Sequence, residues 1–271
     1  MIRWCSYCQS YLGESAPFDD FSMTHTVCKS CSALGRKKLF AQVDKARSIA
    51  EFYNSFRQAA IQAKNISVEE ILAQGEALGL KDIDLCVGII QPILYEIGEL
   101  WKKGEVTVAH EHIFTEFAEH LVRQVSHRFF AKLGSAENKG LDVLLVCADG
   151  NYHTVGVRMI DMAISELGLK TKVITPGLPA HEIITLLNLH RPRILGISLS
   201  LMEQVEEVIE IANIVQNNDT LLGTKIIVGG CAIRKQEEIF KGFTHVLVAP
   251  NDLITLKKMF SDEFQLKNRV G

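Results

Sequence analysis

From residue 141 to the end, the chain alternates short apolar runs with longer segments in which apolar positions recur at helical spacing. Apolar runs without polar interruption are typical of parallel strands that are covered on both faces of a sheet. The pattern predicts five strands, at residues 141–147, 170–175, 193–199, 224–229 and 244–249. Helices separate these strands, so we expect an α/β fold with a doubly wound parallel sheet.

Residues 50–132 show helical periodicity and no strand signal. Ser67 is placed to cap a helix that has two glutamates in its first turn, and Gly79 follows the end of that helix. The next helix is apolar on nearly every side, which is typical of a bundle interior, and Pro92 predicts a kink in it. Together these signals predict a four-helix bundle, with helices at about residues 50–64, 68–78, 81–103 and 107–132.

The fourth helix carries an apolar stripe that we expect to face the bundle core: Ile113, Phe117, Leu121, Val125 and Phe129. Trp101 also lies on an apolar stripe and is a core residue by periodicity alone, and His110 falls on the apolar side of its helix. His112 projects away from the stripe, so the pattern places it either in solvent or against a ligand.

Two pairs of cysteines lie near the start of the chain, Cys5-x-x-Cys8 and Cys28-x-x-Cys31, with 19 residues between the pairs. This spacing is typical of two turns that present four thiolates to Zn²⁺, and it favours zinc over a redox dithiol. His25 is an alternative fourth ligand. The ending His25-Thr-Val-Cys28-Lys-Ser-Cys31 resembles the small zinc modules of bacterial sensor and regulator proteins, which implies an adaptor role.

The composition is that of a folded protein without a dominant charge: 47% of the 271 residues are hydrophobic, and the net charge is -3. This charge gives no general reason to expect a nucleic acid or an anionic membrane as a partner. Residues 1–66 hold nine Lys/Arg and five Asp/Glu, including Arg36-Lys37-Lys38, so nucleic-acid contact there is a minor alternative to a solvated face. No apolar run reaches the roughly 18 residues of a membrane span and no signal peptide is recognisable, so we expect a cytoplasmic protein with no membrane partner.

These patterns divide the chain into a zinc module (1–33), a linker helix (34–49), a four-helix bundle (50–136) and a sheet domain (137–271). The predicted fold class is therefore α/β: a flavodoxin-like (Rossmann-like) five-stranded parallel sheet, preceded by the bundle and by a small N-terminal zinc-binding module. Three further cysteines stand singly in apolar segments and are expected to be buried: Cys86, Cys147 and Cys231.

Candidate functional residues follow three of the predicted strands. His153 lies in the loop after the first strand, Ser198 and Ser200 end the third, and Gly229-Gly230 end the fourth. The carboxyl ends of parallel strands share one edge of the sheet, where ligands of such folds bind. An imidazole, hydroxyls and a stretch without side chains suit a long, slender ligand group, and the chain has no glycine-rich motif for a dinucleotide or a nucleoside triphosphate.

As a set, these residues resemble the motif of the cobalamin-binding domains of methionine synthase and its relatives, which is Asp-x-His-x-x-Gly, then Ser-x-Leu, then Gly-Gly. Here the chain reads Asn151-Tyr-His153-Thr-Val-Gly156, 41 residues, Ser198-Leu-Ser200, 28 residues and Gly229-Gly230. The resemblance covers residues 50–271, because that family also has a four-helix bundle before the sheet. It implies that His153 is the lower axial ligand of cobalt, that Ser198 hydrogen-bonds the displaced dimethylbenzimidazole, and that Gly156, Gly229 and Gly230 make room for that tail.

Two positions depart from the motif. Asn151 stands where the family has a carboxylate that orients the ligand histidine, and an amide can orient the ring while adding less basicity. Ser200 replaces the leucine, which we expect to loosen the packing around the tail.

The segment from Trp101 to His110-Glu111-His112 resembles the CarH-type B12 photoreceptors, in which a tryptophan is followed by Glu-His at the same spacing. The resemblance implies adenosylcobalamin as the cofactor, held between bundle and sheet. Trp101 would pack beside the 5′-deoxyadenosyl group, Glu111 would bind its sugar, and His112 would ligate cobalt after light cleaves the cobalt–carbon bond.

The resulting hypothesis is a cobalamin-dependent photoreceptor for signal transduction or transcription regulation, and not an enzyme. The zinc module and basic helix occupy the place of the helix-turn-helix domain of CarH-type repressors, so we expect output through a regulatory protein partner or a changed homo-oligomer. The main alternative is a corrinoid shuttle protein of a methyltransferase system. Such a protein shares the bundle and the sheet but has no need of Trp101, Glu111 and His112.

Overall fold

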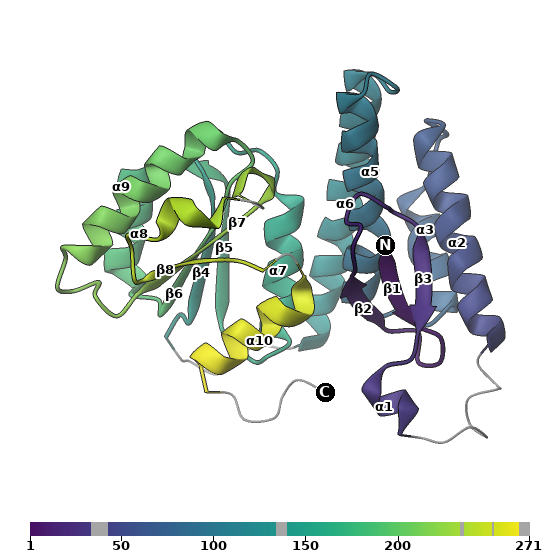
Figure 1. Ribbon diagram of the computed structural model, residues 1–271, viewed down its shortest axis with the longest axis horizontal. Coiled ribbons are helices and arrows are strands. Elements are labelled where there is room, and N and C mark those ends of the chain that lie inside the picture. Colours follow the sequence, from purple (N-terminus) through teal and green to yellow (C-terminus); the bar gives the residue numbers. More distant parts are fainter. Residues whose placement is uncertain (34–42, 134–139, 234–235, 251, 266–271) are drawn as a thin grey trace. The chain divides into compact units, whose positions relative to one another are not determined.

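The structure is a computed structural model that describes residues 1–33, 43–133, 140–233, 236–250 and 252–265 (Figure 1). The chain forms two compact units, Met1–Phe129 and Phe130–Val270. The basic run Arg36-Lys37-Lys38 and most of the predicted linker helix lie outside the described residues. No described helix is long and apolar enough to cross a membrane.

The second unit contains a five-stranded sheet with the strand order β5-β4-β6-β7-β8, in which every neighbouring pair is parallel. The strands are β4 (Val143–Ala148), β5 (Thr171–Leu178), β6 (Ile194–Ser198), β7 (Lys225–Gly229) and β8 (Val246–Val248). In order of sequence this is 2-1-3-4-5, which confirms the predicted flavodoxin-like sheet. All five predicted strands are present.

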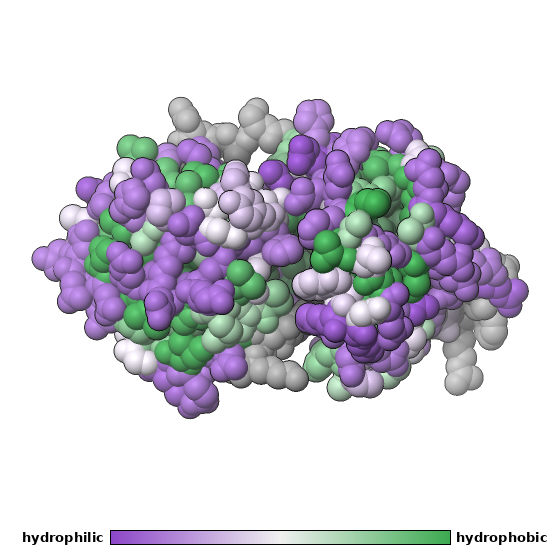
Figure 2. All heavy atoms as spheres, turned by 90° about the horizontal axis from the view of Figure 1, so that it is seen from above, coloured by the Kyte–Doolittle hydropathy of each residue, from purple (hydrophilic) through white to green (hydrophobic). Residues whose placement is uncertain are grey.

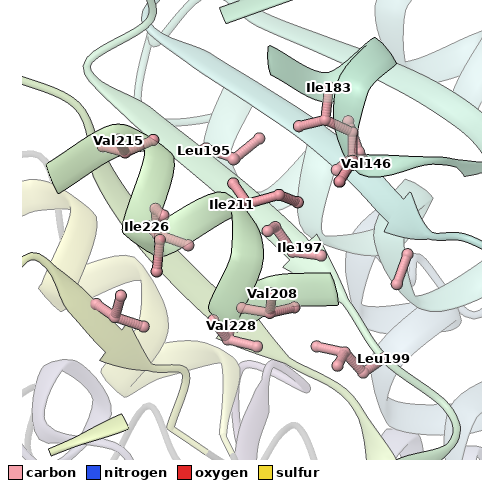
Figure 3. Close-up of a cluster of buried hydrophobic side chains, with 14 of the residues drawn as sticks. Val146, Ile183, Leu195, Ile197, Leu199, Val208, Ile211, Val215, Ile226 and Val228 are labelled. Atoms are coloured by element: carbon pink, nitrogen blue, oxygen red, sulfur yellow. The ribbon is translucent and has the colours of Figure 1, made fainter. Parts of the chain in front are cut away.

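Helices cover both faces of this sheet: α7 (Val155–Ser165), α8 (Ala180–His190), α9 (Val205–Gln216) and α10 (Leu253–Glu263). Successive side chains of a strand point to opposite faces, and β4 divides between two cores accordingly. Leu144 and Val146 pack with α8 and α9, where branched aliphatic side chains fill the interior (Figure 3). Val143 and Leu145 belong to the other core, which includes Phe260 of α10. The sheet is therefore a rigid platform buried on both sides.

The first unit contains the predicted helices. They are α2 (Val43–Ile61), α3 (Val68–Ala77), a continuous helix built from α4 (Asp82–Leu85), η3 (Cys86–Ile90) and α5 (Gln91–Lys102), and α6 (Val108–Leu133), which continues past the unit boundary. Ser67 caps α3 as expected, accepting a hydrogen bond from the Glu70 backbone N–H at 3.3 Å. Helix α2 begins within the predicted linker, so the linker and the first bundle helix are continuous from Val43 onward.

The predicted kink at Pro92 takes the form of a wider helical turn. Residues Cys86–Ile90 form a π-helical turn directly before Gln91 and Pro92. Because proline has no backbone N–H, the helix cannot keep its regular hydrogen bonding there, and π-turns are a recognised way of accommodating such an interruption. We call the helical part of this unit, α2 to α6, the cap.

The predicted apolar stripe of α6 is partly wrong. Ile113 is 64% exposed, whereas Leu121 and Val125 are buried. A stripe with steps of four residues advances by 400° per step, so it winds around the helix and only its middle part stays on the core side. The buried face of α6 is instead formed by Phe114, Ala118, Leu121, Val122 and Val125.

A small sheet precedes the cap, with the order β2-β1-β3: β1 (Ile2–Cys5), β2 (Tyr11–Glu14) and β3 (Met23–Thr26). A one-turn helix, α1 (Lys29–Ser32), follows it and is capped by Cys28. The sequence predicts the cysteine turns of this region but not the sheet. We call residues 1–33 the cysteine module.

Candidate functional site

The edge of the large sheet is formed by three neighbouring strand ends. Cys147 near the end of β4 is paired in register with Ser198 of β6, and Ser198 is paired with Gly229 of β7. The loop from β4 to α7 carries His153 above this edge, and His153 is exposed. No described residue hydrogen-bonds its imidazole, so both ring nitrogens are accessible to a ligand. The sequence-predicted residues His153, Ser198 and Gly229 are thus brought together.

Asn151 is buried (1% exposed) and fixes the loop that carries His153. Its Nδ2 donates to the Ser198 carbonyl at 2.8 Å, while its Oδ1 accepts hydrogen bonds from the His153 backbone N–H at 3.0 Å and the Ser200 hydroxyl at 2.6 Å. The expected contact with the histidine ring is not observed, because both functions of the amide are used by the loop backbone and Ser200. Asn151 therefore shapes the loop rather than orienting the imidazole directly.

Two residues that the sequence analysis missed also hold this loop. Gln204, buried before α9, donates to the Asp149 carbonyl at 2.9 Å and accepts from the Ser200 and Leu201 backbone N–H groups. Glu207 accepts from the Asp149 backbone N–H at 2.7 Å. Both come shortly after Ser200 in the sequence, but nothing in their spacing identifies the backbone groups that they bind.

The three glycines of the motif differ in what an added side chain would meet. At Gly156 an added Cβ would meet nothing within 4 Å, so this glycine leaves open space beside the start of α7. At Gly230, where φ is +117°, a Cβ would overlap the Leu199 carbonyl, so the chain itself requires glycine there. At Gly229 the Cβ of Ala249 would lie 3.2 Å away. The open space lies at Gly156, whereas Gly230 allows the ends of β6 and β7 to approach closely.

Ser198 and Cys231 complete this edge. The Ser198 hydroxyl makes no hydrogen bond with the described residues, while its carbonyl is held by Asn151. Cys231 is exposed, and the expectation that it is buried is wrong; Cys86 and Cys147 are buried as expected. Cys231 lies beyond the end of β7, in a short turn after Gly230, and its thiol donates to the Ser200 carbonyl at 3.4 Å.

An exposed imidazole, a free hydroxyl and open space at a glycine fit the requirements of a corrinoid with its nucleotide tail displaced. His153 would supply a nitrogen ligand to the cobalt, and Ser198 and Gly156 would contact the tail. A neutral imidazole nitrogen is an established ligand for transition metals.

The cap presents the other predicted residues at its surface. Trp101, at the end of α5, is 45% exposed and is not the core residue that periodicity alone predicts. His112 has a side chain that is 73% exposed, and its Nδ1 lies 2.5 Å from a Glu111 carboxylate oxygen. The other oxygen of Glu111 accepts from the Thr115 hydroxyl at 2.8 Å. Glu111 is thus held by two partners and in turn restrains the orientation of the His112 ring.

His110 has a packing role, as its place on the apolar side predicts. It is half-buried, and its Nε2 lies 2.7 Å from the Ala60 carbonyl at the end of α2. It lines a cleft of about 850 Å³ between α2, α3 and α6, together with the exposed Ile113 and with Phe117. Apolar side chains reach the surface over this unit (Figure 2). Glu111 and His112 are not among the residues that line this cleft.

The four paired cysteines form a cluster. The thiol sulfurs of Cys5, Cys8, Cys28 and Cys31 all lie within 4.8 Å of one another, and His25 is not part of the group. Burial opposes ionisation of Cys5, but backbone N–H groups of Cys28, Cys8 and Tyr7 lower the pKa of its thiol to about 6. Burial, together with the neighbouring thiols, raises the pKa of Cys31 to about 12. Four thiols this close together cannot all ionise without a cation to offset the repulsion between their charges, so the arrangement could hold a metal ion.

Comparison with known proteins agrees with this geometry. Residues 52–125 and residues 141–250 each match a B12 binding domain family, and together they make up more than half of the chain. The protein therefore belongs to the B12-binding domain proteins, with a helical cap followed by a Rossmann-like domain. It is a cobalamin-binding protein.

Two known proteins are similar to this chain, one in sequence and one in fold. Over 207 residues the chain is 26% identical to the HTH-type transcriptional repressor CarH of Myxococcus xanthus, an alignment that covers 72% of this chain and 62% of that protein. The chain thus spans less than two thirds of that relative. The monomethylamine corrinoid protein of Methanosarcina barkeri has a similar fold, with a TM-score of 0.62 at 11% identity, covering 77% of this chain and 96% of that one.

Proposed function

We propose that the protein is a cobalamin-dependent light sensor that regulates a partner and catalyses no reaction of its own. The observation that carries this proposal is that the cap exposes Trp101 on α5 and also carries the restrained pair Glu111 and His112 on α6. A large aromatic residue left at the surface of a helix is stabilised when a ligand covers it, at roughly 25 cal/mol for each Å² of apolar area removed from water. Adenosylcobalamin, when bound, supplies a cobalt–carbon bond that visible light can break.

The remaining roles follow from the resemblance to CarH-type photoreceptors and from the contacts described above. His153 would supply a nitrogen ligand to the cobalt, and Ser198 and Gly156 would hold the nucleotide tail. Trp101 packs beside the adenosyl group, and Glu111 binds its sugar. His112 would be available as a nitrogen ligand for the metal, because its exposed imidazole contacts only Glu111.

A switch requires contacts that exist in only one of the two states. Trp101 and Glu111 would contact the adenosyl group only in the dark state, and His112 would contact the metal only in the light state. The two states would therefore differ in which cap residues contact the cofactor. We propose that this difference is read by a regulatory partner protein or by a second copy of the chain.

A corrinoid shuttle in methyl transfer is the second candidate. The similar fold of the monomethylamine corrinoid protein favours it, because a cap and a sheet suffice for a shuttle. A shuttle carries a methyl group, which is too small to cover Trp101. The two candidates therefore differ in whether the cap residues discriminate between adenosyl and methyl ligands.

We further propose that the cysteine cluster binds Zn²⁺. Four thiolates within 4.8 Å suit the tetrahedral coordination that zinc adopts in structural sites. The module is also too small to build a core of its own, so a metal ion would contribute much of its stability.

The light-sensor proposal is tested by loading the protein with adenosylcobalamin in darkness and recording absorption before and after green light. We expect a light product whose spectrum is stable in the wild type and is lost in His112→Ala. His127→Ala, an exposed histidine on the same helix, is the matched control and should behave as the wild type. A light product that is identical in His112→Ala, or turnover of a methyl form with a methyltransferase, would favour the shuttle.

A further inference from the structure

Trp4 lies at the contact between the cysteine module and the cap. It precedes Cys5 on β1, and both residues are fully buried (0% exposed). Its ring packs edge-on against Tyr11 of β2, with 6.0 Å between ring centroids. Since a 33-residue module can bury little on its own, a tryptophan without exposed surface needs a partner from outside it. That partner is the cap.

The Trp4 ring contacts the cap at Gly88, which lies inside the π-helical turn. An added Cβ at Gly88 would overlap the Trp4 ring and would lie 3.0 Å from the Tyr11 ring. A glycine in a helix costs roughly 1 kcal/mol relative to alanine, so its presence here is explained by the close approach of the indole. The indole Nε1 is buried without a hydrogen-bond partner among the described atoms, which indicates that shape rather than a polar contact fixes the ring.

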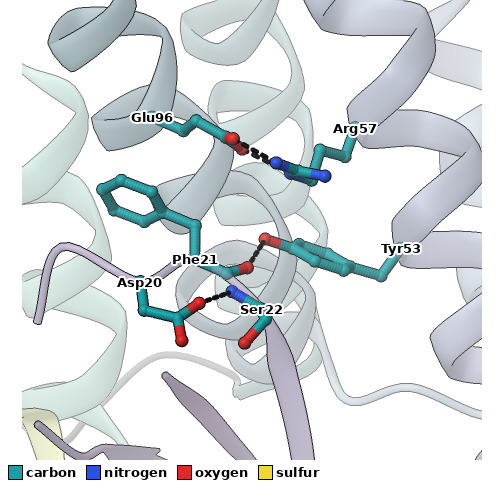
Figure 4. Close-up of polar contacts among 6 residues, drawn as sticks. All are labelled: Asp20, Phe21, Ser22, Tyr53, Arg57 and Glu96. Carbon is teal, nitrogen blue, oxygen red and sulfur yellow. Dashed lines mark hydrogen bonds and ion pairs between the residues drawn. The ribbon is translucent and has the colours of Figure 1, made fainter. Parts of the chain in front are cut away.

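A polar contact also ties the module to the cap, and close to it an ion pair joins two helices of the cap (Figure 4). The Tyr53 hydroxyl of α2 donates to the Phe21 carbonyl at 2.6 Å. One helical turn further along α2, Arg57 pairs with Glu96 of α5 through two hydrogen bonds. Tyr53 is fully buried and Glu96 is 8% exposed, so these contacts are shielded from water. The module, α2 and α5 therefore pack as one body.

We propose that Trp4 is a positioning residue that couples metal binding at the cysteine cluster to the cap helix that carries Trp101. The metal holds Cys5, Cys5 fixes the end of β1, and β1 places Trp4 against the π-turn at Gly88. The same helix continues through Glu96 to Trp101. The inference rests on the proposed metal binding and goes beyond it, because metal affinity and cap geometry become linked quantities.

Linkage is reciprocal: if the metal stabilises the docked module, a change in the cap must alter the affinity for the metal. Gly88→Ala makes such a change in the cap helix, away from the cysteines. Gly98→Ala is the matched control on the same helix, since an added Cβ there meets nothing within 4 Å. Zn²⁺ affinity is measured on the full chain by competition with a chromophoric chelator.

We expect Gly88→Ala to bind Zn²⁺ about tenfold more weakly than the wild type, since overpacking a filled site is destabilising. Gly98→Ala should bind as the wild type. Adding Trp4→Phe to Gly88→Ala makes room for the methyl group and should restore part of the affinity. Equal affinity in all four proteins would overturn the coupling alone, whereas a wild type that binds no metal would remove the metal site and the coupling together.

A second measurement keeps the inference testable if Gly88→Ala does not fold. The unfolding midpoint of the helices is followed by circular dichroism, with Zn²⁺ and with excess chelator. We expect chelation to lower the midpoint by about 2–4 °C in the wild type and in Gly98→Ala. The shift should be smaller in Trp4→Phe, where the joint is loosened. An equal shift in Trp4→Phe would show that Trp4 does not transmit the effect, and the inference would fail.

Discussion

The hydroxyl of Ser200 donates a hydrogen bond to Asn151 Oδ1 at 2.6 Å. These are the two positions at which the chain departs from the motif of its family, and in the structure they are one hydrogen-bonded unit. The same oxygen accepts the backbone N–H of His153, so the pair determines the shape of the loop that carries the predicted cobalt ligand. A substitution of either residue should therefore disturb the hydrogen bonding of the other.

The first prediction concerns Asn151→Asp, which would restore the carboxylate of the family. Nδ2 now donates to the Ser198 carbonyl, and an aspartate oxygen there would face another acceptor in a buried place. We expect the free energy of unfolding at pH 7 to fall by at least about 1–3 kcal/mol. The loss should shrink at lower pH, because a protonated aspartate can donate to the carbonyl. Urea unfolding at two pH values measures it.

Ser200→Ala is the milder companion change and should cost only about 1 kcal/mol, since Asn151 keeps its other contacts. If Asn151→Asp were as stable as the wild type at pH 7 and bound corrinoids more tightly, the carboxylate would be orienting the histidine ring after all. That outcome would contradict the role of Asn151 as a loop anchor.

The second prediction concerns His153→Ala. The side chain is exposed and makes no hydrogen bond with the described residues, so the free energy of unfolding should change by less than about 0.5 kcal/mol. Corrinoid affinity should fall at least about tenfold, because a ligand nitrogen is removed. Equilibrium dialysis with hydroxocobalamin measures it. His181→Ala, an exposed histidine on α8, is the control; an equal effect of both substitutions would remove His153 from the site.

The sequence was sufficient for the sheet because apolar runs, glycines and prolines mark each strand and its ends. It was also sufficient to bring His153, Ser198 and Gly229 to one edge, since parallel strands share their carboxyl ends. The Asn151–Ser200 hydrogen bond was not predictable. It joins two loops that are 49 residues apart, and their register is fixed only by side-chain contacts such as those of Gln204.

Other differences have equally physical reasons. The strands of the cysteine module have four residues each, which is too short for an alternating pattern to stand out. Periodicity placed Trp101 in a core, but a helix that is apolar nearly all round buries only the sides that neighbouring helices cover. Spacing alone identified the four cysteines and could not decide about His25. The geometry decides it, since His25 lies outside the thiol cluster.

The third prediction uses Trp101→Ala to separate the two candidate functions. Truncating a buried tryptophan costs about 3–5 kcal/mol, but Trp101 is 45% exposed, so we expect a cost well below that range. Affinity for adenosylcobalamin should fall, whereas affinity for methylcobalamin should not change, because a methyl group does not reach the indole. Calorimetry in the dark with both ligands measures this. Equal losses with the two ligands would argue against a specific adenosyl contact.

The fourth prediction concerns metal removal. Cys28→Ser should abolish stoichiometric zinc in the reduced protein, because one of four thiolates is lost. Cys231→Ser, an exposed cysteine outside the cluster, should retain the metal. Elemental analysis of both purified proteins measures the zinc content. Absence of zinc from the wild type, or zinc retained in Cys28→Ser, would contradict a four-cysteine site.

The last prediction concerns pH and Glu207. Burial raises the pKa of this carboxyl group, the hydrogen bond from the Asp149 N–H opposes the rise, and the charges of Asp149 and Glu210 add to it. A carboxyl group whose pKa is higher in the folded state than in the unfolded state makes the fold less stable as pH rises from the unfolded value, about 4.3, through the folded one. Glu207 Oε1 is also buried without a hydrogen-bond partner among the described atoms.

Glu207→Gln can still accept the Asp149 N–H and carries no charge, so its sheet unit should be more stable than the wild type at pH 7. The advantage should disappear as the pH falls well below 4.3, because the carboxyl group of the wild type is then protonated in the unfolded state as well as in the folded state. Urea unfolding of the two proteins across this range measures the difference, with the exposed Glu206→Gln as the control. A constant difference at every pH would mean that the charge of Glu207 plays no part in it.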